Sequence, residues 1–192
     1  MENSSNRTLQ RTAAKKIQFF LQSNTRKALL VAGARQVGKT TLIRQLGQEA
    51  FPNFVELNFL ENTAARQLFE TATDSSDFLL RLSALVGERL VPGKTLIFLD
   101  EVQECKEIVT AIKFLVEEGS YRYILSGSLL GVELKDIRSA PFGYLDVLEM
   151  FPMDVEEFAR ANGVSDRILD HLRSCYDKKQ EVDPLVHKKM ME

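Results

Sequence analysis

Cysteine is scarce in this chain, and its scarcity excludes a fold built on disulfides. Only two occur in 192 residues, Cys105 and Cys175, and neither belongs to a CxxC pair or has a histidine placed to complete a zinc site. The two histidines, His171 and His187, have no neighbours at ligand spacing, so we interpret them as solvated or packing residues. Such sparse cysteine is typical of a reducing, cytoplasmic setting.

The chain also lacks a long hydrophobic run and an excess of charge of either sign. No stretch approaches the roughly 18 uninterrupted apolar residues of a membrane span, so we expect a cytoplasmic protein without membrane contact. Lysine and arginine number 25 against 27 acidic residues, a net charge of -2, which is unlike the basic excess of a dedicated nucleic-acid binder. The composition therefore identifies no partner, nucleic acid included.

No repeat of fixed period organises the sequence, so its architecture follows from local patterns. Short apolar runs of the kind found in strands covered on both faces alternate with segments of helical periodicity. Strands are predicted at 28–32, 54–59, 95–99 and 123–125, and helices at the N-terminus up to Leu21, over 41–48, after Asn62, after Asp74 and around 108–118. Gly47, Gly87 and Gly119 are expected to end three of these helices. This alternation predicts an α/β sandwich with a mainly parallel sheet.

A phosphate-binding loop is predicted between the first strand and the helix that follows it. The segment 33–40, GARQVGKT, matches GxxxxGK[ST] in the strand–loop–helix context that the motif requires. Inward backbone N–H groups and the helix N-terminus offer donors to a polyphosphate, while Lys39 would reach the β- and γ-phosphates. An ordinary glycine turn with a solvated lysine is the weaker alternative. The candidate nucleotide-binding residues are Gly33, Ala34, Arg35, Gln36, Val37, Gly38, Lys39, Thr40 and Thr41.

Two adjacent carboxylates, Asp100 and Glu101, follow the apolar strand at 95–99. Open α/β sheets bind ligands beyond the carboxyl ends of their strands, so we expect both to lie beside the phosphate loop. We assign Asp100 and the Thr40 hydroxyl to Mg²⁺, and we assign Glu101, together with Lys39, to catalysis, with Glu101 activating water. A solvated strand end is the alternative, which the neighbouring phosphate loop disfavours.

Polar residues near these motifs permit two interpretations each. The strand at 123–125 leads to Ser126 and Ser128, whose hydroxyls would hold the γ-phosphate or the attacking water if this strand lies between the other two. An ordinary strand-to-loop turn explains these serines equally well. Arg35 and Arg44 are close enough in sequence to contact phosphate, but surface charge is the interpretation we favour.

Four ordered segments together resemble a known family. GARQVGKTTL, TLIFLDEVQE, YILSGSLLG and RSAPFGYLDVLEMFPMDVEEF are similar to the bacterial and archaeal ATP-binding proteins that join an AAA-like P-loop ATPase domain to a C-terminal domain of unknown function, DUF4143. The resemblance runs from about Arg11 to about Phe158. It implies a three-layer P-loop NTPase sandwich of the ASCE class, with a five-stranded sheet of order 5-1-4-3-2.

For the site, the resemblance implies Walker A contacts at Lys39 and Thr40, a Walker B pair at Asp100 and Glu101, and a catalytic sensor at Ser128. Gln103 also matches the family's DEVQ pattern, although the sequence suggests no mechanism for it. Arg138 lies where related ATPases often carry an arginine that completes a neighbouring nucleotide site. A solvated loop arginine is the interpretation that we favour there.

Three segments are expected: an amphipathic N-terminal helix over 1–24, an ATPase core over 25–160 and a helical extension over 161–192, with helices at 164–176 and from Pro184. Because proteins of this family typically continue for a comparable length, we expect the chain to be truncated at the start of a further domain. A homo-oligomer and a partner protein bound through that domain both stay open.

Taken together, these residues predict a domain that binds ATP and, with Mg²⁺, hydrolyses it to ADP and phosphate. Adenine preference rests on the resemblance, since the sequence has no NKxD-type guanine-binding motif. One alternative is a nucleotide-gated switch or scaffold that binds ATP with little turnover. A small-molecule kinase is less favoured, because Asp100 and Glu101 provide a water-activating pair and no arginine-rich lid is evident.

Overall fold

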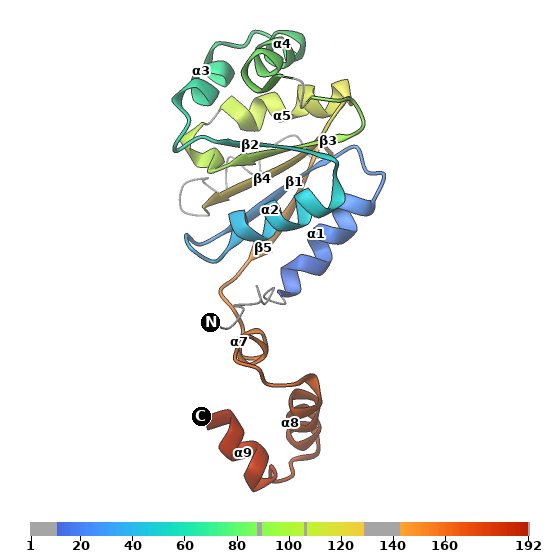
Figure 1. Ribbon diagram of the computed structural model, residues 1–192, viewed down its shortest axis with the longest axis vertical. Coiled ribbons are helices and arrows are strands. Elements are labelled where there is room, and N and C mark those ends of the chain that lie inside the picture. The colour runs from blue at the N-terminus through green and yellow to red at the C-terminus, as the bar shows by residue number, and fades with distance from the viewer. Residues whose placement is uncertain (1–10, 88–89, 106, 129–142, 192) are drawn as a thin grey trace, which may run out of the picture. The chain divides into compact units, whose positions relative to one another are not determined.

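A sheet of five parallel strands forms the centre of the largest part of the chain (Figure 1). The computed structural model describes residues 11–87, 90–105, 107–128 and 143–191. The strands are β1 (Ala28–Gly33), β2 (Asn53–Asn58), β3 (Thr95–Asp100), β4 (Arg122–Ser128) and β5 (Leu145–Met150). They pair in the order β2-β3-β4-β1-β5, and every pair is parallel. Read from the other edge this order is 5-1-4-3-2, so the predicted fold class is confirmed.

Helices cover both faces of the sheet and complete the three layers (Figure 1). One face carries α1 (Thr12–Gln22) and α2 (Lys39–Ala50), and the other carries α3 (Thr63–Thr71), α4 (Ser75–Val86) and α5 (Glu107–Glu118). Alternate residues of one strand enter different layers: Leu29 and Val31 pack with α1 and α2, whereas Leu30 and Ala32 pack with α3, α4 and α5. The wholly apolar runs in the sequence therefore reflect burial on both faces.

The local patterns miss β5, although the resemblance implies a fifth strand. β5 lies at an edge of the sheet and pairs only with β1 among the described strands. Its Leu148 and Met150 are buried, while Val147 and Glu149 are exposed. In a strand that is covered on one face, polar and apolar residues alternate along the sequence. This short alternation indicates a strand less strongly than the apolar runs of the inner strands do.

Side-chain caps begin two helices where the sequence predicts them. The Oδ1 atom of Asn62 accepts the N–H of Ala65 at 3.0 Å, and Oδ1 of Asp74 accepts the N–H of Asp77 at 2.9 Å. Each bond satisfies a backbone donor that the first helical turn leaves without a partner. The starts of α3 and α4 are therefore confirmed by their capping geometry.

The expectation that Gly47 ends its helix is wrong, because α2 continues to Ala50. Gly47 instead lets α2 approach the sheet closely. A Cβ atom at this position would lie 2.6 Å from Cε2 of Phe54 and 2.9 Å from Cδ2 of Leu96. A glycine inside a helix can thus mark close packing as well as a helix end.

The described residues divide into two compact units, those within 13–151 around the sheet and those of 11–12 together with 152–191. The second unit contains α7 (Val155–Ala161), α8 (Asp166–Lys178) and α9 (Pro184–Met191), so the expected helical extension is present. Its small core contains Ala159, Val164 and Leu169. The limits 1–24, 25–160 and 161–192 stay a prediction. Among the described residues, the helices lack the length and the apolar content of a membrane span.

We expect Gly33→Ala to destabilise the sheet. Gly33 pairs with Met150 of β5, and a Cβ atom there would lie 2.2 Å from the Met150 carbonyl oxygen. Because the obstructing atom belongs to the backbone of β5, the expected loss in the free energy of unfolding is about 1–3 kcal/mol, measured by urea denaturation. Ala34→Ser, at the exposed next position, is the control, with a change under about 0.5 kcal/mol. Equal stability of the two variants would contradict this close approach.

Candidate functional site

The loop between β1 and α2 leads from the carboxyl end of an inner strand of the sheet directly into a helix. Gln36 and Gly38 have left-handed backbone, with φ of 64° and 93°, and α2 begins immediately afterwards at Lys39. The first backbone N–H groups of a helix have no acceptors within it and carry its partial positive charge. A loop of this form presents several N–H donors to an anion. The strand, loop and helix follow one another as the phosphate-loop motif requires.

The side chain of Lys39 folds back over the start of the loop. Its Nζ donates to the carbonyl oxygens of Gly33 at 3.1 Å and Ala34 at 2.7 Å, and the residue is only 5% exposed. Burial lowers the pKa of Lys39, and the nearby carboxylates of Glu101 and Asp100 act in the opposite direction. The ammonium group is thus held by neutral acceptors close to two acidic side chains.

The Asp100 carboxylate is the centre of a hydrogen-bond cluster at the end of β3. Thr40 Oγ1 lies 3.2 and 3.0 Å from its two oxygens, and Ser126 Oγ donates to Oδ1. Asn58 Nδ2 donates at 3.2 Å and the backbone N–H of Glu101 at 3.1 Å. Asp100 is 1% exposed, and burial raises its pKa while the bonds from Ser126 and Thr40 oppose that shift. The structure thus brings Asp100 and Thr40 together.

Sequence reasoning misses Asn58, which belongs to this cluster. Its Nδ2 faces Asp100, while its Oδ1 accepts the N–H groups of Leu60 and Glu61 at 2.9 and 3.1 Å. Asn58 is the last residue of β2 and is paired with Asp100 in the sheet register. The available signal was therefore its position: a polar residue at the carboxyl end of the strand beside β3.

Glu101 and Ser128 lie at the ends of neighbouring strands and are linked through Gln103. Glu101 has left-handed backbone, with φ of 55°, and leads into the 3-10 helix η2 (Val102–Glu104). Gln103 Nε2 donates to Glu101 Oε2, and Gln103 Oε1 accepts the N–H of Ser128 at 3.0 Å. Ser128 is buried on β4, between β1 and β3, and is paired with Gly33 at the start of the loop. The order of strands on which the sensor prediction depends is thus present.

The arginines near the loop have carboxylate partners. Arg44 makes two hydrogen bonds to Glu56, at 2.8 and 2.6 Å, on the exposed side of α2. The Arg35 side chain is 69% exposed and lies 3.9 Å from Glu104. Both placements agree with the favoured interpretation of surface charge. Arg138 lies outside the described residues.

The donor set suits a hard cation only in part. In the described ranges, no group of three or more His, Cys, Asp and Glu side chains could hold a metal ion. Thr40 and Asp100 supply oxygen atoms, which Mg²⁺ prefers, and Mg²⁺ commonly completes its octahedron with water and substrate phosphate. The residues therefore fit a cation that arrives with a phosphate ligand.

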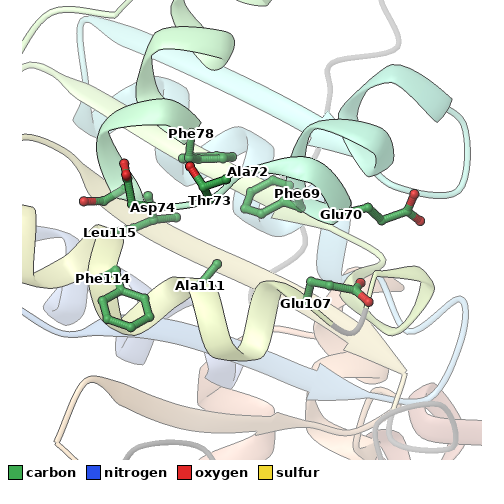
Figure 2. Close-up of a pocket in the computed structure, with 11 residues that line it drawn as sticks. Phe69, Glu70, Ala72, Thr73, Asp74, Phe78, Glu107, Ala111, Phe114 and Leu115 are labelled. Carbon is green, nitrogen blue, oxygen red and sulfur yellow. The ribbon is translucent and has the colours of Figure 1, made fainter.

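A separate cavity of about 360 Å³ lies between α5 and the pair α3 and α4 (Figure 2). Phe69, Phe78, Ala111, Phe114 and Leu115 supply most of its apolar lining. Its acidic lining residues are Glu70, Asp74 and Glu107. None of the predicted site residues lines this cavity, so it lies apart from the phosphate loop.

Comparisons with known proteins agree with this architecture. The family model described as an AAA domain matches residues 25–159. A closed-state reconstruction of Hsp104 with ATPγS and FITC-casein is similar at 15% identity and a TM-score of 0.53, over 83% of this chain and 30% of that chain. A variant of RuvB from Thermotoga maritima is similar at 16% identity and a TM-score of 0.49, over 95% of this chain and 69% of that chain. The search of curated proteins gave no match.

These structural matches bear on the fold alone. The chain spans 30% of the length of the Hsp104 chain that it matches, at an identity where site residues are not carried over. What the Hsp104 match supports is the sandwich around the parallel sheet.

We expect Ser126→Ala to destabilise the chain more at neutral than at acidic pH. The variant removes a buried hydrogen bond to Asp100, an expected loss of about 1.5–3 kcal/mol in the free energy of unfolding. That bond lowers the pKa of Asp100, so the variant raises the pKa further above its ordinary value. A carboxyl group with a raised pKa stabilises the fold below the unfolded value and loses that contribution as pH rises through the folded value.

Urea denaturation at about pH 4 and about pH 7 measures this difference. Ser83→Ala is the control, because Ser83 is exposed on α4 and its hydroxyl bonds only the Leu79 carbonyl among the described contacts. Equal losses for Ser126→Ala at both pH values would contradict the assigned contact with the carboxylate.

Proposed function

Because the chain belongs to the AAA domain family, we propose that it binds ATP with Mg²⁺ and hydrolyses it to ADP and phosphate. One observation carries this proposal: the Thr40 hydroxyl, at the start of α2, lies 3.0 Å from the Asp100 carboxylate at the end of β3. That contact joins the phosphate-type loop to an acidic group at the same edge of the sheet. P-loop NTPases use this combination for metal-assisted phosphoryl transfer.

In this proposal the nucleotide phosphates lie against the loop from Gly33 to Thr41. Backbone N–H groups of the loop and of the first turn of α2 bind the phosphate oxygens. Lys39 exchanges the carbonyl oxygens of Gly33 and Ala34 for the β- and γ-phosphates, whose oxygens carry more negative charge. The lowered pKa of Lys39 is consistent with a buried ammonium that gains from an anionic partner.

Thr40 and Asp100 are the residues that would hold Mg²⁺, directly or through its waters. Bound there, the ion would neutralise charge on the phosphates. The burial that raises the pKa of Asp100 also means that a nearby cation would stabilise its ionised form. The support for this Mg²⁺ site is therefore the placement of Thr40 beside Asp100.

Glu101 is the proposed catalytic base, and Ser128 is the proposed sensor of the γ-phosphate. Glu101 follows Asp100 directly, and Ser128 ends the strand between β1 and β3. Glu101 would orient and deprotonate the attacking water. The second candidate is a nucleotide-gated switch with little turnover, which the contact between Glu101 and Gln103 favours because it engages the carboxylate within the protein.

Assembly and cellular context belong to the proposal as well. AAA-type domains often oligomerise, and we propose either a homo-oligomer or a partner protein bound through a further, DUF4143-type domain. The arginine-finger role of Arg138 and the cytoplasmic location stay predictions from the sequence.

We expect Lys39→Ala to abolish nucleotide binding. The variant removes the only buried ammonium at the described loop, and with it the charge-assisted bonds to the phosphates. Titration calorimetry with Mg·ATP should show an affinity weakened by about 100-fold or more. Lys16→Ala, at an exposed position of α1, should bind like the wild type. Equal affinities of the two variants would exclude this loop as the nucleotide site.

We expect Glu101→Gln to bind ATP normally and to stall hydrolysis. The amide keeps the shape of the side chain but cannot accept a proton from water, so phosphate release should fall by about 100-fold or more. A phosphate-release assay beside the binding titration measures both effects. Glu70→Gln, at an exposed position of α3, is the matched control. Retained turnover in Glu101→Gln would refute the base assignment, and binding without turnover in the wild type would favour the switch.

A further inference from the structure

Both polar groups of the Gln103 side chain are in use, each toward a different candidate site residue. Its Oε1 accepts the backbone N–H of Ser128 at 3.0 Å, and its Nε2 donates to Oε2 of Glu101. The partners determine which way the amide faces, because a backbone N–H can only donate and an ionised carboxylate can only accept. A side chain at this position therefore needs one acceptor and one donor.

The backbone that carries Gln103 is held by its own short turn. The N–H of Glu104 bonds the Glu101 carbonyl at 3.0 Å, and the N–H of Cys105 bonds the Val102 carbonyl at 3.1 Å. Val102 is 2% exposed and belongs to the core cluster on the α3, α4 and α5 face of the sheet. Because the buried Val102 side chain packs this turn against the core, the amide of Gln103 has a defined position between the ends of β3 and β4.

We propose that Gln103 is a positioning residue that fixes the Glu101 carboxylate relative to the end of β4. This inference rests on the proposed ATPase function, in which Glu101 acts on water and Ser128 lies near the γ-phosphate. Gln103 itself touches neither water nor nucleotide in the proposal. A displacement of Ser128 moves the hydrogen-bonded amide, and the amide carries the Glu101 carboxylate with it.

The amide is chemically specific at this position. Gln103→Glu preserves size and keeps an acceptor for the Ser128 N–H, but it places a second carboxylate against Glu101. Gln103→Met has a similar length and removes both polar groups. Gln45→Met is the matched control, because Gln45 Nε2 also donates to a glutamate, Glu49, at 3.1 Å, but on the exposed surface of α2. It therefore loses the same kind of contact without touching the site.

Steady-state hydrolysis by the full chain tests the catalytic consequence. We expect Gln103→Glu and Gln103→Met to lower kcat by about 10- to 100-fold while KM for ATP changes by less than about threefold. Gln45→Met should match the wild type. Thermal unfolding of each variant shows whether a lower kcat is caused only by a loss of folded protein. A folded Gln103→Glu variant with wild-type kcat would overturn the proposal.

A second measurement separates this inference from the proposed function. In ¹H–¹⁵N spectra of the full chain, Glu101→Gln should shift the Ser128 amide resonance when Gln103 is present, and this shift should vanish in the Gln103→Met background. If Glu101→Gln leaves the Ser128 amide resonance unchanged, the positioning link is overturned, regardless of the measured hydrolysis rate. If the wild type releases no phosphate but Ser128 responds, the hydrolysis proposal fails and the link stands.

Discussion

The buried carboxylate of Asp100 is the constraint on which the arrangement of the site depends. An ionised group that has lost its water must be compensated by hydrogen bonds or a counter-charge. Asp100 receives hydrogen bonds from the side chains of Thr40, Asn58 and Ser126 and from the backbone of Glu101. The side-chain donors come from α2, β2 and β4, and Asp100 itself ends β3, so satisfying one carboxylate brings four elements to one point. The phosphate-type loop is thereby held beside the acidic end of the sheet.

Parallel pairing explains why this convergence could be predicted from sequence. When every strand runs in one direction, all carboxyl ends meet at one edge, and residues that directly follow apolar runs become neighbours. Gly33, Asp100 and Ser128 each end an inner strand, and the structure brings them together because β4 lies between β1 and β3. Apolar runs buried on both faces are also the strongest strand signal, so these strands were predictable, although β4 continues past the predicted 123–125 to Ser128.

The features that the sequence did not disclose depend on contacts between elements. Asn58 belongs to the Asp100 cluster only because β2 pairs with β3 in a particular register, which no local pattern encodes. The side chain of Gln103 reaches its partner Ser128 because β4 lies beside β3. Glycine commonly ends helices, but Gly47 lies inside α2. Its lack of a side chain there leaves room for Phe54 and Leu96 of the adjoining strands. Local sequence thus predicts where the inner strands lie, and tertiary packing decides what the residues at their ends contact.

Each charged candidate group already has a partner within the protein, and this determines which ligand can displace those partners. The ammonium of Lys39 bonds two neutral carbonyl oxygens, while Glu101 bonds the neutral amide of Gln103. Charge-assisted bonds between two ions are stronger than bonds from an ion to a neutral group, so a polyphosphate can outcompete the carbonyls for Lys39. A neutral ligand has no such advantage. In the proposed function this exchange favours an anion that brings its own cation to Asp100, while Gln103 continues to hold the Glu101 carboxylate in place.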